Sequence, residues 1–277
     1  MYEIKSGHLV RILGADHDIA TLTLDDVAAY IDKRKVEGAC TNTISKELVT
    51  LRAALRVARK RGIYDGHPED LIPTGFAPKY VPRKRWLTTE EFEKLIGALP
   101  AMRRPHVATM VYTGLRLSEA ERLRPNHVDV ERRRLFVPGT KTEEAAAEIP
   151  LSASALPWLQ AALAQRSEGQ KTLFAPWGNI RRDLRAACVK VKIDPVSTND
   201  LRRTFSSWLE QAGIPRGTNA RLMRHTTTAM VDRVYARSAP DALVAAVDHL
   251  PATHVAPVPP TSAAGDDESD LRRDAGS

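Results

Sequence analysis

The chain has 277 residues, 43% of them hydrophobic and 27% charged, and its formal net charge is +7. This length allows two modest domains with ordinary cores. No apolar stretch is long enough to cross a bilayer, the N-terminus carries no secretory signal, and Cys40 and Cys188 fit neither a disulfide framework nor a metal motif. Composition therefore favours a reduced, cytoplasmic protein over a membrane-spanning or disulfide-stabilised one.

The positive charge is unevenly distributed along the chain. Residues 265–277 hold five acidic residues and two arginines, which leaves about +10 on the other 264 residues. An excess of this size favours a polyanionic partner, because lysine and arginine displace condensed counterions from phosphates. By itself this bias indicates a nucleic-acid partner without establishing one.

Residues 1–75 are predicted to form a helical domain. Thr23-Leu24-Asp25-Asp26 has the form of a capping box and predicts a helix to about Lys35, which Gly38 ends. A longer helix is expected over about residues 43–61, where apolar residues recur at helical spacing. No helix is expected in the twenty residues before the first of these, so the domain is predicted to lack an initial helix.

The second of these helices is strongly basic on its remaining faces. Its cations, with only Glu47 to offset them, are Lys46, Arg52, Arg56, Arg59, Lys60 and Arg61. Such a run is usually just a solvated face, but the imbalance favours contact with a DNA backbone. The candidate contacts are Lys46, Arg52, Arg56 and Lys60.

Proline, glycine and basic residues dominate residues 73–85. Proline and glycine discourage regular structure, so a basic linker is predicted over residues 76–86. Its cations are further candidates for DNA contact: Lys79, Arg83, Lys84 and Arg85.

A second domain is predicted over residues 87–250, opened by the capping box Thr88-Thr89-Glu90-Glu91. Its expected elements are helices at about 105–112, from 118 onward, 180–191, 200–212, 219–224 and 229–236, and a hairpin of 134–138 with 147–151. These elements predict a mainly α fold with a small antiparallel β-sheet, in the α+β class.

Two features are expected at the C-terminal end of this domain. Residues 240–250 carry apolar side chains at helical spacing, and they could dock either onto a neighbouring subunit or onto their own domain. Residues 251–277 are rich in proline, alanine, serine, glycine and acids, which bury too little apolar area to fold. A disordered tail is predicted there.

The first motif with possible chemistry is Thr113-Gly114-Leu115-Arg116-Leu117-Ser118-Glu119. An apolar helix runs into a glycine turn, and Ser118 is predicted to cap the next helix. This arrangement would present Arg116 from a well-supported bend. Equally, Arg116 could pair with Glu119 or Glu121 and have no further role.

A second motif contains Asn199-Asp200-Leu201-Arg202-Arg203 near the start of a helix. A helix N-terminus favours anions, and the planar fork of an arginine can bind two phosphate oxygens at once. Arg203 is a further candidate for DNA contact, although such a residue is more often at the surface or in contact with the linker than catalytic.

The third motif is Leu222-Met223-Arg224-His225, followed by Arg233-Val234-Tyr235. A lone histidine after a helix is usually a cap or a core residue, and a lone tyrosine beside valine and alanine is usually half-buried packing. Neither residue would indicate catalysis by itself.

Taken together and in this order, the motifs resemble the tyrosine recombinases, also called phage integrases. The residues that carry the resemblance are Arg116, Lys141 in the Gly-Thr-Lys-Thr hairpin, Arg202, His225 and Tyr235. The resemblance covers about residues 87–250, and the first domain resembles the helical core-binding module of that family. It implies a two-domain clamp around duplex DNA.

The resemblance also implies a division of roles. Tyr235 would attack a DNA phosphate and form a 3′-phosphotyrosine, while Arg116 and Arg202 neutralise the charge on the non-bridging oxygens. Lys141 would protonate the leaving 5′-oxygen, and His225 would hydrogen-bond the phosphate. No metal or cofactor is expected. The implied partners are paired double-stranded DNA attachment sites bound by a homotetramer, with possible accessory DNA-bending proteins and a nucleoid location.

Two residues depart from the family pattern. Asn199 stands where the family usually has histidine, and asparagine cannot exchange a proton near neutral pH. Arg224 stands where glycine usually precedes the histidine, and it could contact phosphate or crowd the pocket. These departures leave open a catalytically impaired DNA-binding relative. A type IB topoisomerase-like enzyme, which would share the chemistry but relax supercoils as a monomer, is a second alternative.

Overall fold

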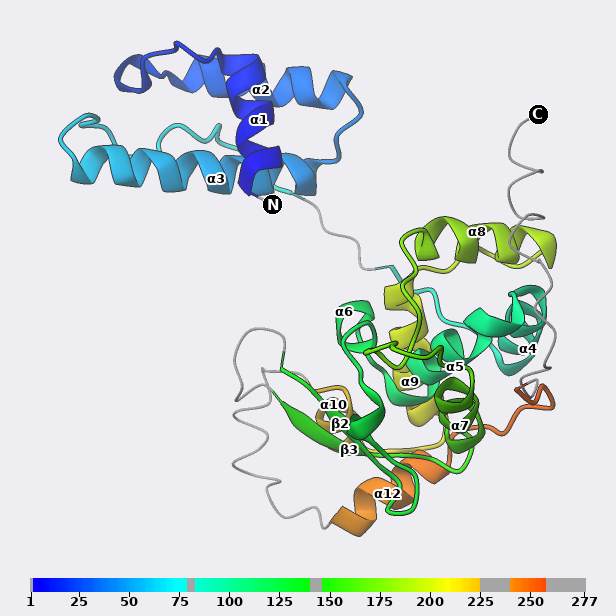
Figure 1. Cartoon of the computed structure of the whole chain (residues 1–277). Helices are drawn as coiled ribbons and strands as arrows, with labels where there is room; N and C mark the ends of the chain where they lie inside the picture. Colours follow the sequence, from blue (N-terminus) through cyan, green and yellow to red (C-terminus); the bar gives the residue numbers. More distant parts are fainter. Residues whose placement is uncertain (1, 79–82, 140–145, 225–239, 258–277) are drawn as a thin grey trace. The chain divides into compact units, whose positions relative to one another are not determined.

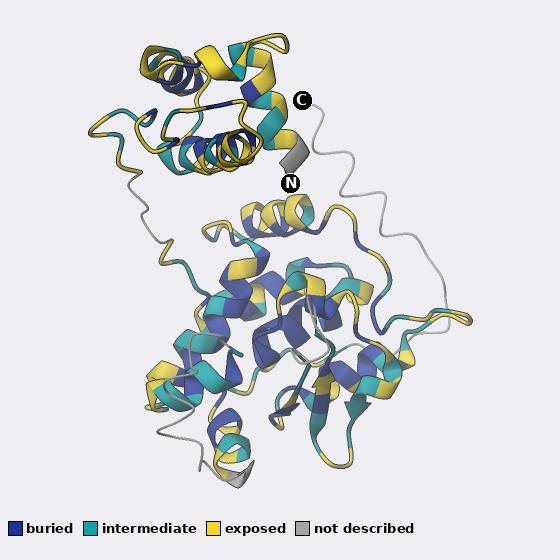
Figure 2. Cartoon of the chain, turned by 90° about the vertical axis from the view of Figure 1, so that its left-hand side faces the viewer, coloured by how far each residue is buried: buried dark blue, intermediate teal, exposed yellow. Residues whose placement is uncertain are grey.

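The computed structural model describes residues 2–78, 83–139, 146–224 and 240–257 (Figure 1). The chain divides into two compact units, residues 1–83 and 84–277, and the division falls inside the stretch predicted as a linker. Each unit has its own buried interior beneath an exposed surface (Figure 2).

The described residues of the first unit form three helices, α1 (Tyr2–Leu13), α2 (Leu24–Val36) and α3 (Thr41–Lys60), with a 3-10 turn at Ile19–Thr21. The predicted capping box at the start of α2 is confirmed, since the Thr23 hydroxyl accepts from the Asp26 amide at 3.2 Å and the Thr23 amide donates to the Asp26 carboxylate at 2.9 Å. Val27, Ile44 and Leu55 are fully buried between the helices.

The expectation that no helix precedes residue 20 is wrong, because α1 lies there. Its apolar pattern is weak: Leu9 is buried, whereas Ile4 and Val10 are exposed at 71% and 49%. Short helices owe most of their stability to tertiary packing. Here α1 packs mainly against α3, a contact that the local sequence does not announce.

Glu47 does not offset the exposed cations of α3, as the sequence suggested, because it points into the core with 2% exposure. Its carboxylate accepts from the Arg34 guanidinium at 2.8 and 3.0 Å and from the Tyr30 hydroxyl at 2.7 Å. A buried carboxylate requires such partners. The exposed surface of α3 is thus more basic than the sequence count implied.

The second unit is an α+β domain. Its helices are α4 (Thr89–Ala98), α5 (Arg104–Thr113), α6 (Leu117–Ala120), α7 (Leu156–Ala164), α8 (Ile180–Lys190), α9 (Thr198–Gln211), α10 (Arg216–Leu222) and α12 (Pro240–Asp248), with 3-10 turns at Ala101–Arg103 and Pro125–His127. The strands β1 (Val128–Asp129), β2 (Arg134–Val137) and β3 (Ala147–Pro150) form one antiparallel sheet in that order.

Most predicted elements of this unit are confirmed. The hairpin pairs Leu135 with Ile149, and the helices at 105–112, 180–191 and 200–212 lie within two residues of α5, α8 and α9. The helix predicted at 219–224 begins earlier, at Arg216. The predicted helix at 229–236 lies outside the described residues. β1 and α7 were not predicted; α7 is almost uniformly apolar and therefore has no amphipathic period to detect.

Helix α5 is the centre of the core. Every residue from Pro105 to Thr113 is buried, and α5 packs against both α7 and α9 (Figure 1). Phe92 makes edge-to-face contacts with Tyr112 and with Trp208, each at 5.6 Å between ring centroids. These rings join α4, α5 and α9 into one rigid layer.

Helix α12 packs against other elements of its own unit, which is one of the two alternatives left open for residues 240–250. Val247 and Leu250 are buried against the core, and the Asp248 carboxylate pairs with Arg133 and accepts from the Ala153 amide at 3.1 Å. Disorder is a wrong prediction for residues 251–257. The Tyr112 hydroxyl donates to the Pro251 carbonyl at 3.1 Å, and the His254 amide donates to Glu93 at 2.8 Å. The rest of the predicted tail lies outside the described residues.

Candidate active site

The turn that presents Arg116 depends on Gly114. This residue ends α5 in the left-handed conformation at φ +60°, and a Cβ there would lie 2.6 Å from the Phe205 ring. Both the dihedral angle and the close approach require glycine. The bend is therefore fixed by packing against α9.

Arg116 itself, and not Ser118 as predicted, is the N-cap of α6. The Arg116 amide donates to Glu119 Oε2 at 2.8 Å, so the cap is the Glu119 carboxylate three residues on. The Arg116 guanidinium also donates to Glu119 Oε1 at 2.7 Å, yet its side chain stays 43% exposed. Arg116 is thus paired and still open to solvent.

Arg202 comes from the second turn of α9 and is buried at 7% exposure. Its guanidinium donates to the carbonyl oxygens of Gly114 and Met223, which lie just past the ends of α5 and α10. Helix C-termini leave carbonyls unsatisfied and partially negative, so they suit a cation. Burial, with Arg224 and Arg116 nearby, lowers the pKa of Arg202 to about 9.

Arg224 adopts a left-handed backbone at φ +53°, the conformation that explains glycine at this place in the family pattern. Its guanidinium donates to the Gly114 and Leu222 carbonyls at 3.1 Å each and to Glu119 Oε2 at 2.9 Å. The sequence left phosphate contact or crowding open for this residue, and these contacts are all with groups of the protein itself. Arg224 therefore links Leu222, the Gly114 turn and Glu119 inside the protein.

Glu119 is the carboxylate shared by this arginine cluster and is buried at 5% exposure. Burial would raise the pKa of its carboxyl group, but Arg224 and Arg116 outweigh that effect and hold the pKa below its usual value. The sequence treated Glu119 only as a possible partner of Arg116. Its position inside the Thr-Gly-Leu-Arg-Leu-Ser-Glu motif was the available signal for a larger role.

An open pocket of about 540 Å³ lies beside α9. Four predicted site residues line it together, namely Lys84, Asn199, Arg202 and Arg203, along with Trp86, Ser206, Ser207, Glu210 and Met223. Asn199 is exposed, and Arg203 forms an ion pair with the buried Asp200. Arg202, Arg203 and the predicted linker cation Lys84 therefore line one basic pocket.

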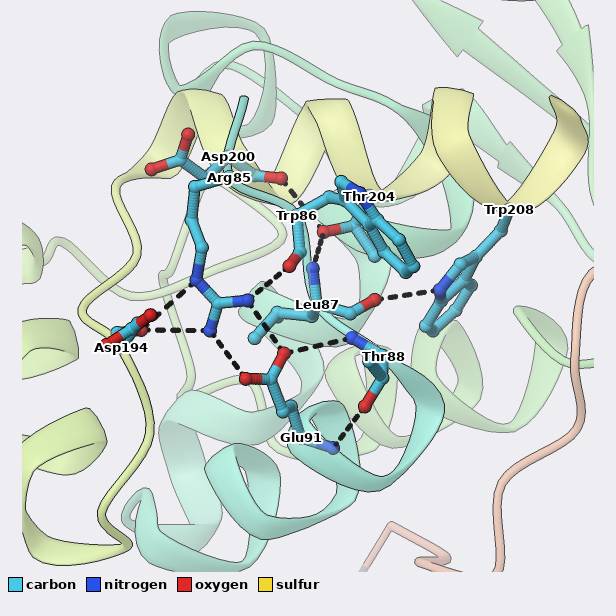
Figure 3. A network of polar contacts seen from close by, with 9 residues as sticks. All are labelled: Arg85, Trp86, Leu87, Thr88, Glu91, Asp194, Asp200, Thr204 and Trp208. Atoms are coloured by element: carbon cyan, nitrogen blue, oxygen red, sulfur yellow. Dashed lines mark hydrogen bonds and ion pairs between the residues drawn. The ribbon is translucent and has the colours of Figure 1, made fainter. Parts of the chain in front are cut away.

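Arg85 is not among the residues that line this pocket, and its guanidinium is already hydrogen-bonded within its own unit (Figure 3). Its guanidinium donates to Glu91 at 2.7 and 3.0 Å and to the Asp194 carbonyl at 2.9 Å. In the same network, the Leu87 amide donates to Thr204 at 3.0 Å and the Trp208 ring donates to the Leu87 carbonyl at 2.9 Å. Arg85 thus helps to anchor the start of this unit against α4 and α9.

The remaining predicted contacts divide into two groups. Lys46, Lys60, Arg83 and Lys84 are exposed, Arg52 is half-exposed, and Arg56 is exposed but paired with Glu69. Lys79, Lys141, His225 and Tyr235 lie outside the described residues, although β2 and β3, which flank Lys141, are described.

Within the described ranges, no helix is long and apolar enough to span a membrane. In that same part of the chain, no cluster of three or more His, Cys, Asp or Glu side chains is arranged to hold a metal ion.

Comparison with known proteins agrees with this architecture. XerC tyrosine recombinases of Yersinia pestis and Serratia marcescens are each 24% identical to this chain, over 211 and 213 residues. The alignments cover 74% and 75% of this chain and 65% and 64% of those proteins, so the chain spans just under two thirds of their length.

Solved structures share the fold. A lambda integrase dimer bound to a COC′ core site superposes with a TM-score of 0.68 at 22% identity, covering 83% of this chain and 88% of that one. The Tn1549 transposon integrase with circular intermediate DNA superposes with a TM-score of 0.65 at 19% identity, covering 87% and 91%. The model of the phage integrase family matches residues 85–241, more than half of the sequence. This chain therefore belongs to the phage integrase family, the tyrosine recombinases.

Proposed function

We propose that this protein is a site-specific recombinase that cuts and rejoins DNA through a covalent 3′-phosphotyrosine at Tyr235. The observation that carries the proposal is the charge of the Gly114 turn. Arg116, Arg202 and Arg224 converge there, and Glu119 is the one carboxylate that the described residues bring into hydrogen-bond contact with these arginines. Such a site retains a net positive charge for an anion.

The chemistry explains the use of that charge. Transesterification at phosphorus passes through a five-coordinate state in which extra negative charge falls on the non-bridging oxygens. Arg202, preorganised by two carbonyls, and the exposed fork of Arg116 would stabilise those oxygens. One phosphodiester replaces another, so the reaction needs no ATP.

Proton transfer is assigned to residues of the family motif. A phenol with a pKa of about 10 is mostly protonated at neutral pH, so Tyr235 needs a base or a strongly cationic site. Asn199, exposed in the pocket beside Arg202, can donate a hydrogen bond to phosphate but cannot take the proton. Lys141 would protonate the leaving 5′-oxygen, and His225 would hydrogen-bond the phosphate.

The proposed partners are paired double-stranded DNA sites, bound by a tetramer of this chain with possible accessory DNA-bending proteins. Lambda integrase, which shares the fold, has been solved as a dimer on a core site and as a tetramer on a Holliday junction. The exposed cations of α3, together with Arg83 and Lys84, would contact the DNA backbone. The biological task is integration or excision of a mobile element, or resolution of replicon multimers.

A library of nicked duplexes with randomised sequence tests the proposal. A recombinase traps itself on such substrates because the cleaved fragment diffuses away, and the adduct survives denaturation and can be sequenced. We expect an adduct with the wild type and none with Tyr235→Phe. Salt-sensitive DNA binding without any adduct would instead support the catalytically impaired relative, and relaxation of supercoils by a monomer would support the topoisomerase alternative.

The role of Asn199 has its own test. If the family's histidine mainly moves a proton, Asn199→His should form the adduct faster. An unchanged rate would assign this position to phosphate orientation alone.

A further inference from the structure

Arg224 has a backbone conformation that is unfavourable for any residue other than glycine. At φ +53° a side chain crowds its own backbone, and glycine would relieve that strain. A strained residue persists only where its surroundings hold it in place. The contacts of Arg224 should therefore indicate which interactions hold it in this strained conformation.

Those contacts point inward. The side chain is 10% exposed, and its two terminal nitrogens donate to the carbonyls of Gly114 and Leu222 and to Glu119. Its Nε is buried and has no hydrogen-bond partner among the described residues. Arg224 could reach a phosphate only by giving up these bonds, so a direct DNA contact does not explain it.

The decisive contact is the one to Glu119. Oxygen Oε2 of this carboxylate accepts from Arg224 at 2.9 Å and from the Arg116 amide at 2.8 Å. Oxygen Oε1 accepts from the Arg116 guanidinium at 2.7 Å. Because Oε2 is occupied, Arg116 holds the carboxylate through one nitrogen only. Without Arg224, the carboxylate would be free to accept both arms of the Arg116 fork, which is the strongest geometry for such a pair.

We propose that Arg224 is a positioning residue that occupies Glu119 and thereby leaves part of the Arg116 fork free for the DNA phosphate. The proposal rests on the proposed recombinase function. Arg224 also ties the Gly114 turn to the end of α10, and Arg202 donates to that same Gly114 carbonyl. One side chain thus sets the position of both motif arginines.

The test compares two arginines with the same backbone conformation. Arg133 lies at φ +52° and donates to the Leu151 carbonyl at 2.7 and 2.9 Å, without contact to the arginine cluster. Arg133→Gly and Arg224→Gly remove similar strain and similar contacts. We expect Arg224→Gly to slow adduct formation on the nicked substrate by about 10- to 100-fold, the usual effect of losing a positioning contact, and Arg133→Gly to leave it unchanged.

A double variant separates positioning from simple support of the fold. If Glu119 traps Arg116 when Arg224 is absent, adding Glu119→Gln to Arg224→Gly should restore part of the rate, because a neutral amide binds the fork weakly. A purely structural role predicts further loss instead. Melting curves of each variant identify any that fail to fold, and Arg224→Lys, which keeps the charge and one donor, should retain an intermediate rate.

Three outcomes would overturn the proposal, and they distinguish failure of the positioning role from failure of the recombinase function. An active wild type with equal rates for Arg224→Gly and Arg133→Gly, or further loss in the double variant, would refute the positioning role alone. A wild type that forms no adduct would refute the recombinase function and the positioning role together.

Discussion

Arg34 in the first unit and Arg202 in the second are both buried, each at 7% exposure, but they have opposite surroundings. Arg34 donates to the carboxylates of Glu47 and Glu37, and those bonds raise the pKa of its guanidinium. Arg202 donates to carbonyl oxygens, and burial beside Arg224 and Arg116 lowers its pKa.

The difference separates an arginine whose charge is cancelled within the protein from one whose charge is retained. The charge of Arg34 is neutralised within the protein, so it contributes to the fold and has little left for a ligand. Carbonyls hold Arg202 in place without cancelling its charge, so that charge stays available to an anion. Both residues are arginines and both are equally buried, so the difference lies in whether the hydrogen-bond acceptor is a charged carboxylate or a neutral carbonyl.

The largest effect is expected from breaking the ion pair between Arg34 and Glu47 in the first unit. Glu47→Gln leaves the Arg34 guanidinium buried without its main counter-charge, so the free energy of unfolding should fall by about 3–5 kcal/mol. Urea denaturation, read through hydrogen exchange of α2 and α3, would measure the loss. A loss below 1 kcal/mol would mean that Arg34 is not neutralised as described.

The second prediction concerns the arginine whose charge is retained. Arg202→Lys keeps one charge but loses the planar fork, so adduct formation should slow by about 10²–10³-fold. Arg185→Lys on the exposed face of α8 is the matched control and should keep the wild-type rate. Equal rates for both variants would show that Arg202 is structural like Arg34.

The third prediction uses a buried base that has no polar partner. His106 is 2% exposed, stacks on Phe174 at 4.3 Å, and neither ring nitrogen has a hydrogen-bond partner among the described residues. Burial, with Arg103 nearby, lowers its pKa to about 4, so the folded state binds fewer protons than the unfolded state below pH 6.5. Stability should therefore fall by up to about 3 kcal/mol as pH drops from 6.5 to 4.

Melting curves across that pH range would measure the effect in the wild type. His106→Phe, which preserves a stacked ring and removes the titrating group, should flatten this part of the profile. A profile with the same slope in the variant would assign the acid sensitivity to other groups.

The smallest effect is expected at an exposed pair. Arg56 and Glu69 are 60% and 53% exposed, so solvent screens their attraction. Glu69→Gln should leave the free energy of unfolding close to that of the wild type, measured by urea denaturation. A loss of stability as large as that expected for Glu47→Gln would contradict the view that an ion pair must be buried to contribute strongly to the free energy of unfolding.

The sequence predicted well the elements that depend on neighbouring residues, and it predicted poorly those that depend on packing between distant segments. The capping boxes at Thr23 and Thr88 and the β2–β3 hairpin are confirmed, because each depends on residues close together in the chain. Helix α1 and residues 251–257 were predicted wrongly, because packing against distant segments orders them.

The candidate site shows the same division. The order of five motif residues was visible in the sequence and identified the family, namely Arg116, Lys141, Arg202, His225 and Tyr235. The sequence could not show that Arg85 is bound to Glu91 and Asp194, or that Arg203 pairs with Asp200. Arginines that look equivalent in the sequence therefore differ in the groups that they bind within the protein.

The sequence alone determined which chemical groups this protein has: the arginines of the motifs, the glycine that the Gly114 turn requires, and a tyrosine in the expected order. Only the tertiary structure decided which of their charges are cancelled. Arg224 and Glu119 are 105 residues apart, and they meet because α5 packs against both α6 and α9 while α9 packs against α10. A local pattern can specify a turn or a cap, but a charge balance depends on every group that folding brings within a few ångströms.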